Sequence, residues 1–156
     1  MVDTLTTLYI KGLNQLKTEL QAYSSETNIW VIKDGITNSS GILAKHLIGN
    51  LNHYIGAVIG NSEYIRNRER EFENQPVPRE ALLKQIDVLI ETLQKVLSEL
   101  NVMLLPQEYP LQVFGHPMTY QFFLIHLLGH LNYHLGQVNY HRRIIDSTEF
   151  RSRPHT

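Results

Sequence analysis

Apolar side chains recur at steps of three and four residues in four separate stretches of the chain, with polar residues between them. This spacing is typical of amphipathic helices, in which one stripe of each helix faces the core. Since each apolar stripe has to be covered by its neighbours, the sequence predicts an all-α four-helix bundle. The predicted helices cover about residues 4–23, 39–59, 79–103 and 119–146, with Ser39 or Ser40 at the start of the second and Thr119 at the start of the last.

Three long connections separate these helices, and all of them belong to one predicted domain, residues 1–156. The first connection is polar but contains an apolar patch, residues 29–32, which we expect to fold back as a lid over one end of the bundle. The second, residues 61–78, alternates Arg and Glu and is predicted to be a solvated connection. The third contains residues 111–114, which can form a short extended piece. The tail, residues 149–156, is predicted to be flexible.

Two glycines weaken the second predicted helix. Gly49 and Gly56 lie seven residues apart and therefore on one face of that helix. A glycine in a helix interior costs roughly 1 kcal/mol relative to alanine. A close approach to the helix backbone explains such a cost, and the spacing leaves two sources of it open, a neighbouring helix or a ligand.

Charge and composition exclude several classes of function. The 14 Lys and Arg residues nearly balance the 15 Asp and Glu residues, so no broad basic face for nucleic acid is expected. The absence of cysteine excludes a cysteine nucleophile and thiolate ligands, so any thiol chemistry needs an external thiol. The first residues lack the pattern of a signal peptide, and no stretch reaches the ~18 apolar residues that cross a membrane. We therefore predict a cytoplasmic protein that binds neither membrane nor nucleic acid.

Histidines gather in the last predicted helix, which contains four of the eight in the chain: His126, His130, His134 and His141. On a helix that turns 100° per residue, these four and Gln137 lie within a sector of about 80°. Imidazoles four residues apart can aim one nitrogen each at a common point, which is how a His-x-x-x-His pair binds Zn²⁺, Ni²⁺ or Fe²⁺. The helix offers such a pair twice, because His130 can pair with His126 or with His134.

These rings lie among large apolar residues, and a buried imidazole needs a polar partner. Hydrogen bonds across the bundle satisfy any single histidine, but three in register favour a shared metal ion. A third ligand has to come from another helix, and His46 and His53 are the candidates. They lie about 10 Å apart along their helix, so only one can reach a single ion, and spacing alone does not choose. No glutamate stands between His130 and His134, so a zinc peptidase is not predicted.

Two segments resemble the DinB-like superfamily of metal-binding four-helix bundles: Ala44-Lys45-His46-Leu47-Ile48-Gly49-Asn50 and His130-Leu131-Asn132-Tyr133-His134-Leu135-Gly136-Gln137. Their order along the chain is also similar, and the likeness covers most of the chain. The stretch Tyr64-Ile65-Arg66-Asn67-Arg68-Glu69 before Glu71-Phe72 adds to the likeness. The resemblance implies that His46, His130 and His134 hold one divalent ion, zinc or nickel, with water in the open position. It also implies a homodimer. Candidates for the pocket, or for contacts that orient the ligands' outer nitrogens, are Asn50, His53, His126, Tyr133, Gln137 and His141.

Characterised members of that superfamily use low-molecular-weight thiols such as bacillithiol or mycothiol. The resemblance therefore implies a metal-dependent enzyme that transfers such a thiol to a small electrophile, with no catalytic residue assigned. Tyr54, Arg142 and Arg143 are further candidates for substrate contacts. A non-catalytic, metal-stabilised bundle is the alternative hypothesis, and a hydrogen-bonded histidine network without a metal is the third.

Overall fold

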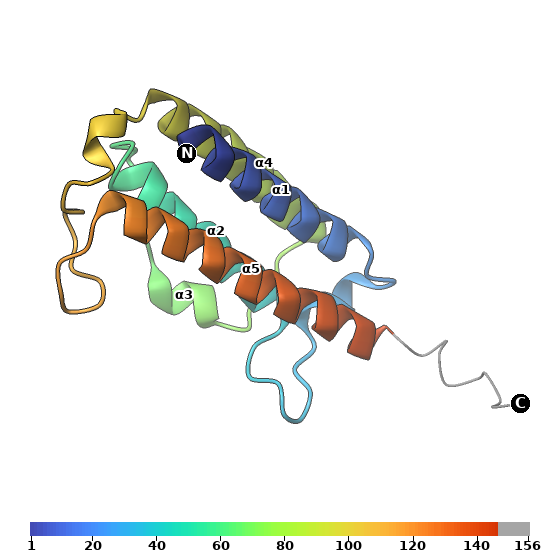
Figure 1. Cartoon of the computed structure of the whole chain (residues 1–156). Helices are drawn as coiled ribbons and strands as arrows, with labels where there is room; N and C mark the ends of the chain where they lie inside the picture. Colours follow the sequence, from blue (N-terminus) through green and yellow to red (C-terminus); the bar gives the residue numbers. More distant parts are fainter. Residues whose placement is uncertain (147–156) are drawn as a thin grey trace, which may run out of the picture.

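The structure, a computed structural model, describes residues 1–146 of the 156-residue chain (Figure 1). Every regular element in this part is helical, and its one β-type pairing is an isolated bridge between Glu108 and Thr119. The prediction of an all-α bundle is therefore confirmed. The elements are α1 (Val2–Gln21), the 3-10 helix η1 (Glu26–Trp30), α2 (Ser40–Leu51), the π-helix η2 (Asn52–Ala57), α3 (Arg68–Phe72), α4 (Arg79–Glu99), the 3-10 helix η3 (Val102–Leu104) and α5 (Tyr120–Ile145).

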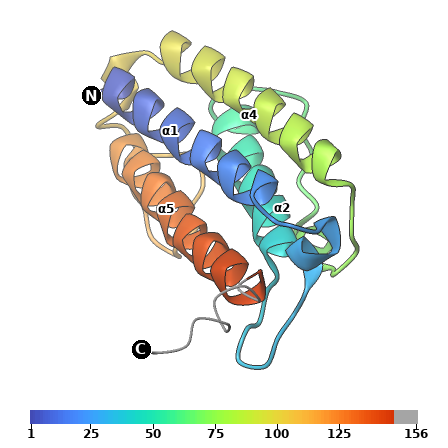
Figure 2. The same cartoon turned by 90° about the vertical axis from the view of Figure 1, so that its right-hand side faces the viewer.

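Four long helices form the bundle, in the order α1, α4, α2, α5 around its core (Figure 2). Helices α1 and α5 run in one direction, whereas α2 and α4 run in the other (Figure 1). Since α2 and α4 are parallel neighbours, the chain between them has to return along the whole bundle. The short helix α3 lies on this return, where it packs against the outer side of α2 (Figure 1). None of the helices in residues 1–146 is long and apolar enough to cross a membrane.

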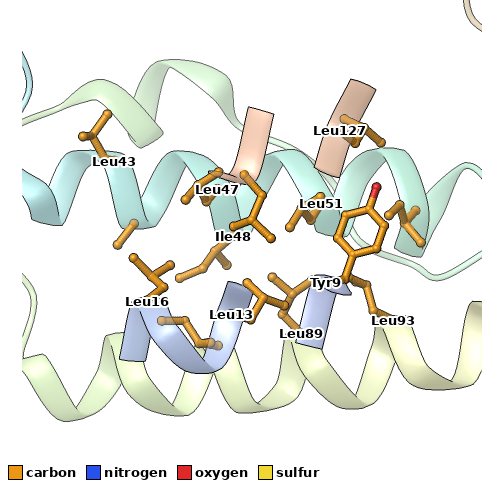
Figure 3. Close-up of a cluster of buried hydrophobic side chains, with 14 of the residues drawn as sticks. Tyr9, Leu13, Leu16, Leu43, Leu47, Ile48, Leu51, Leu89, Leu93 and Leu127 are labelled. Carbon is orange, nitrogen blue, oxygen red and sulfur yellow. The ribbon is translucent and has the colours of Figure 1, made fainter. Parts of the chain in front are cut away.

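The core is built from the stripes that the sequence pattern predicts, and Figure 3 shows its central part. Leu13 and Leu16 of α1 meet Leu47 of α2 and Leu89 of α4, and all four side chains are fully buried. Each buried leucine stabilises the fold by about 1.5–3 kcal/mol relative to an exposed one. The buried Tyr9 hydroxyl donates to the Leu124 carbonyl oxygen of α5 at 2.6 Å, which satisfies the polar end of a large aromatic side chain.

Side chains cap the two helices that carry the candidate ligands. The Ser39 hydroxyl accepts a hydrogen bond from the Ile42 amide at 3.3 Å, and the Thr119 hydroxyl accepts one from the Phe122 amide at 3.1 Å. Each cap satisfies a backbone donor that the first turn leaves free. The predicted start of each helix is thereby explained, with Ser39 rather than Ser40 as the cap of α2.

The second predicted helix does not continue as an α-helix to residue 59, as the sequence pattern suggested. It ends at Leu51 and continues as the π-helix η2, in which the Val58 amide donates to the His53 carbonyl oxygen at 2.9 Å. A π-turn contains more residues than an α-turn, so it changes the register of every side chain that follows. His53 is the second residue of this segment, and its ring packs on Tyr54.

The connections differ from their predictions in three places. Residues 61–78 are not merely a solvated connection, because they contain α3 and the buried Glu71. The apolar patch at residues 29–32 is divided, with Ile29 and Trp30 buried and the next two residues exposed. Residues 111–114 form no regular element. The predicted flexible tail, residues 149–156, lies outside the described residues.

Candidate metal centre

Three histidines from two helices bring one ring nitrogen each to a common point. The Nε2 atom of His130 lies 3.2 Å from Nε2 of His46 and 3.1 Å from Nε2 of His134. Ligand atoms from all three rings lie within 4.8 Å of one another. Ligand nitrogens of a tetrahedral zinc site, each 2.0–2.1 Å from the ion, lie about 3.3–3.4 Å apart. The two measured separations are therefore close to those of ligand nitrogens that share one metal ion.

The outer nitrogens of two rings determine which tautomer each ring adopts. His46 Nδ1 lies 3.0 Å from a carboxylate oxygen of Glu71, and His134 Nδ1 lies 2.6 Å from the amide oxygen of Gln137. Both partners are acceptors, so each Nδ1 carries the proton and each Nε2 presents a lone pair to the common point. His130 Nε2 can donate to only one of these lone pairs. A cation at this point satisfies both, which a hydrogen-bonded network does not.

His130 differs from the other two rings at its outer nitrogen. Its outer nitrogen, Nδ1, is buried and has no hydrogen-bond partner within residues 1–146. Burial lowers the pKa of His130 to about 4, and the neighbouring His134, His46 and His126 and the charge of Arg66 add to this effect. His130 is therefore neutral at neutral pH, which is the form that coordinates a metal ion.

His134 is held at the more open edge of the site. Burial lowers its pKa, and His46 adds to this effect, whereas the hydrogen bond from Nδ1 to Gln137 opposes it. The Gln137 amide nitrogen in turn donates to the Tyr133 hydroxyl at 3.4 Å. His130 and His134 are half-buried and His46 is buried, so the site opens to solvent on the α5 side.

An ion pair that the sequence reasoning missed supports the third ligand. Glu71 of α3 contacts His46, and Arg66 contacts both oxygens of the same carboxylate, at 2.7 and 2.8 Å. Burial alone would raise the pKa of Glu71, but the hydrogen bonds from Arg66 and His46 and their charges outweigh it and hold the pKa below its ordinary value. The charged run around Arg66 resembles a solvated surface, so its sequence contained no signal for this role.

The other candidate residues divide into those near the site and those away from it. Gln137 orients His134, as the sequence analysis anticipated for it, and Tyr133 lies beside the same ring. His126 stacks on Phe123 and lies 6.3 Å from His130 between ring centres. The remaining three make other contacts: Asn50 is buried and its side-chain oxygen has no partner within residues 1–146, His53 packs on Tyr54, and His141 bonds to Tyr23 and Val31.

The three candidate substrate contacts all have partners within the chain. Arg142 pairs with Glu19 at 2.7 Å, and Arg143 lies over the ring of Tyr140. Tyr54 packs edge-on against Phe123 and lies beneath the guanidinium of Arg66. A role of these three side chains toward a substrate stays a prediction.

A cavity of about 280 Å³ lies next to the site, between the loop before α2 and the last turns of α5. Gln137 lines it and also bonds His134, so this one side chain connects the cavity with the ligand group. The rest of the lining is neutral: Gly35, Ile36, Thr37, Asn38, Leu43, Tyr140, His141 and Ile144.

Comparison with known proteins places the chain in a family without an assigned activity. Residues 6–154 match the family described as "Protein of unknown function (DUF1572)". A solved structure, described as "Crystal structure of the conserved protein of locus from Enterococcus faecalis", is similar with a TM-score of 0.75. It is 13% identical, and the match covers 95% of this chain and 98% of that one, so the likeness concerns the fold alone. No curated protein matches the chain.

Proposed function

The chain belongs to the DUF1572 family, and on that premise we propose that it is a metal-dependent enzyme with one divalent ion on His46, His130 and His134. One observation supports the proposal most strongly: the Nε2 atoms of three rings from two helices converge on one point. Two of these atoms, in His46 and His134, present lone pairs, and His130 Nε2 can donate a proton to only one of them. Imidazole ligands suit zinc and nickel, the two metals we favour. The histidine spacing also supports membership of the DinB-like superfamily, which remains part of this proposal.

The arrangement favours a reactive site over a closed one. Three protein ligands leave at least one coordination position of a divalent ion for another molecule. When bound, such an ion acts as a Lewis acid that lowers the pKa of a thiol or water placed against it. The chain supplies neutral imidazoles, and Glu71 and Arg66 together add no net charge, so the site attracts an anionic ligand such as a thiolate.

The reacting thiol has to come from outside, because the chain contains no cysteine. We propose that a low-molecular-weight thiol of the bacillithiol or mycothiol kind is the first substrate and a small electrophile the second. The half-buried rings of α5 leave the site accessible to molecules of this size. The proposal places the reaction in the cytoplasm, where such thiols are kept reduced.

The proposed activity can be tested with the metal-loaded protein. Bacillithiol, mycothiol or glutathione is mixed with monochlorobimane, and the rate of conjugation is compared with that of His130→Ala. We expect acceleration by the wild-type protein with at least one of the thiols and none by the variant. Equal rates for the two proteins with every thiol would count against transferase activity.

A metal-stabilised protein without catalysis is the second candidate. It is favoured by the buried Glu71–Arg66 pair, which fixes a ligand as firmly as a structural site requires. Cobalt substitution separates the two candidates, because an exchangeable position lets an added thiol change the visible absorption spectrum. An unchanged spectrum in the presence of excess thiol favours the structural role.

We also propose that two copies of the chain associate through the outer face of α5. Four large side chains of α5 are 49–65% exposed: Phe122, Ile125, Tyr133 and Tyr140. Their spacing places them on one stripe, along which an antiparallel α5 of a second copy can pack. Ile125→Glu should convert a dimer to a monomer in sedimentation equilibrium, whereas Val88→Glu, on the exposed side of α4, should not. A monomeric wild-type protein would contradict this proposal.

A further inference from the structure

Glu71 occupies a place in the fold that the proposed metal site alone does not explain. It lies on the short helix α3, outside the bundle, yet its side chain is only 6% exposed and reaches across to α2. We propose that Glu71 is a positioning residue, whose carboxylate holds the His46 ring in the tautomer and orientation that direct Nε2 toward the metal. The inference rests on the proposed metal binding and names the device that prepares the third ligand.

The contacts of the carboxylate restrict what His46 can do. One oxygen of Glu71 lies 3.0 Å from His46 Nδ1, and the guanidinium of Arg66 contacts both oxygens. An ionised carboxylate only accepts hydrogen bonds, so Nδ1 of His46 has to donate. The lone pair of the ring is then on Nε2, 3.2 Å from His130 Nε2.

A glycine in α2 makes room for this carboxylate. A Cβ atom at position 49 would lie 2.1 Å from Oε1 of Glu71 and 2.7 Å from its Cδ atom, closer than nonbonded atoms approach. Any residue other than glycine therefore displaces the carboxylate or the helix. The close approach predicted from the cost of Gly49 is thus made by a neighbouring helix, α3, through the side chain of Glu71.

A second buried carboxylate provides the matched comparison. Glu19 of α1 is 4% exposed, and its side chain accepts hydrogen bonds from Arg142, Asn139 and Gln15 at 2.7, 2.8 and 3.1 Å. Like Glu71, it is buried and paired with an arginine. It contacts none of the three ligand histidines, so a purely structural ion pair of this kind affects stability without affecting the metal.

Hydrogen bonds that a ligand histidine donates to a carboxylate have a known effect on metal affinity. They fix the ring and raise its basicity, and their loss typically lowers metal affinity 10- to 100-fold. We therefore expect Glu71→Gln to lower the affinity for Zn²⁺ about 10-fold and Glu71→Ala about 100-fold. Gly49→Ala should have an effect of the same kind, because the added methyl group displaces the carboxylate.

The experiment measures Zn²⁺ affinity by competition with a chromophoric chelator, using the full-length wild-type protein and the variants Glu71→Gln, Gly49→Ala and Glu19→Gln. The visible spectrum of the Co²⁺-loaded proteins is recorded as a second readout of ligand geometry. We expect weaker binding and a shifted spectrum for the first two variants. Glu19→Gln should lower the resistance to urea but leave the affinity within about twofold, which a general loss of stability does not reproduce.

The tautomer of His46 can also be measured in the metal-free wild-type protein, which tests the role of Glu71 even if a variant folds poorly. Nitrogen chemical shifts of the imidazoles in metal-free wild-type protein report which nitrogen of His46 carries the proton. We expect the proton on Nδ1, and finding it on Nε2 would overturn the inference. It would also be overturned if Glu71→Gln bound Zn²⁺ as tightly as the wild-type protein, while the proposed metal site would survive. A wild-type protein that binds no Zn²⁺ would overturn both.

Discussion

Helix α5 contains histidines with two different fates, separated by two turns of one helix. His130 and His134 direct their Nε2 atoms at each other and at His46 of α2. His141 lies in the same angular sector of the helix, but its Nδ1 contacts the Tyr23 hydroxyl at 2.6 Å and its Nε2 donates to the Val31 carbonyl oxygen at 2.8 Å. Histidine and register are the same at both places. The segment that faces each histidine determines its role. It supplies a third imidazole, His46, opposite His130 and His134, and it supplies hydrogen-bond partners for both ring nitrogens of His141.

The difference also appears in the polar surroundings of the two regions. Near His141, Arg142 and Asn139 bind the buried Glu19, so this end of α5 is anchored to α1. Near the ligand histidines, the buried carboxylate is Glu71, which binds a ligand ring instead. The C-terminal end of α5 therefore contributes to packing against α1, and its middle presents the nitrogen lone pairs of the ligand histidines.

The largest expected effect distinguishes the two regions by metal content. His130→Ala should lower metal affinity by more than about 100-fold, because the remaining two rings no longer surround the ion. His141→Ala should retain about one ion per chain, because its ring contacts none of the ligands. Metal analysis after gel filtration in the presence of equimolar Zn²⁺ measures both. Loss of metal from His141→Ala would contradict the assignment of His141 to a structural role.

Bound metal should stabilise the fold only through the ligand histidines, His46, His130 and His134. At a free Zn²⁺ concentration 100 times the dissociation constant, a ligand that binds the native state adds about 2.7 kcal/mol to the free energy of unfolding. The wild-type protein and His141→Ala should gain this increment, and His134→Ala should gain little. Urea unfolding with and without Zn²⁺ provides the values. An equal gain in all three proteins would indicate that the ion binds elsewhere.

The structural histidine should affect stability without metal. His141→Phe removes the hydrogen bonds of the buried ring to the Tyr23 hydroxyl and the Val31 carbonyl oxygen, and a typical hydrogen bond contributes about 0.5–1.5 kcal/mol. The Tyr23 hydroxyl keeps its hydrogen bond to Ser40, so part of the network remains. Urea unfolding of the metal-free protein measures the loss. His126→Phe is the control, since His126 lies at the protein surface and should change stability less.

The smallest expected effect is the pH dependence of the stability that Glu19 contributes where α5 packs against α1. Burial raises the pKa of Glu19, but the hydrogen bonds from Arg142, Asn139 and Gln15 outweigh it, and the folded-state pKa is lower than the unfolded one. Its contribution is therefore present above the unfolded value, about 4.3, and lost as the pH falls toward the folded value. The stability difference between wild type and Glu19→Gln, about 1 kcal/mol at neutral pH, should shrink between about pH 5 and 3. A difference that grows on acidification would contradict this assignment.

Sequence periodicity predicted the bundle because each helix shows its buried stripe directly. The last helix illustrates this, since Thr119 caps it and its histidines occupy the predicted face. Periodicity could not decide between His46 and His53, because both fit one helix face and the groups that meet His46 come from α3 and α5, far away in the sequence. It also could not separate His141 from the ligands, because the partners of His141 come from segments more than 100 residues away.

The role of Glu71 was beyond the reach of pattern reasoning for a related reason. An alternating run of Arg and Glu is typical of a solvated surface, and only the return of the chain along the bundle brings this carboxylate to α2. Gly49 was the one trace of it in the sequence. Its unexplained cost pointed to a close approach, without indicating what approaches.

Metal-edge X-ray absorption of protein purified without an affinity tag and loaded with one equivalent of Zn²⁺ tests the central claim most directly. The convergence of three Nε2 atoms predicts three imidazole nitrogens at about 2.0–2.1 Å from the ion, with an additional scattering contribution from an exchangeable ligand. The same measurement on His130→Ala should show fewer imidazoles. A wild-type spectrum without imidazole scattering would contradict the claim that these three histidines share one ion.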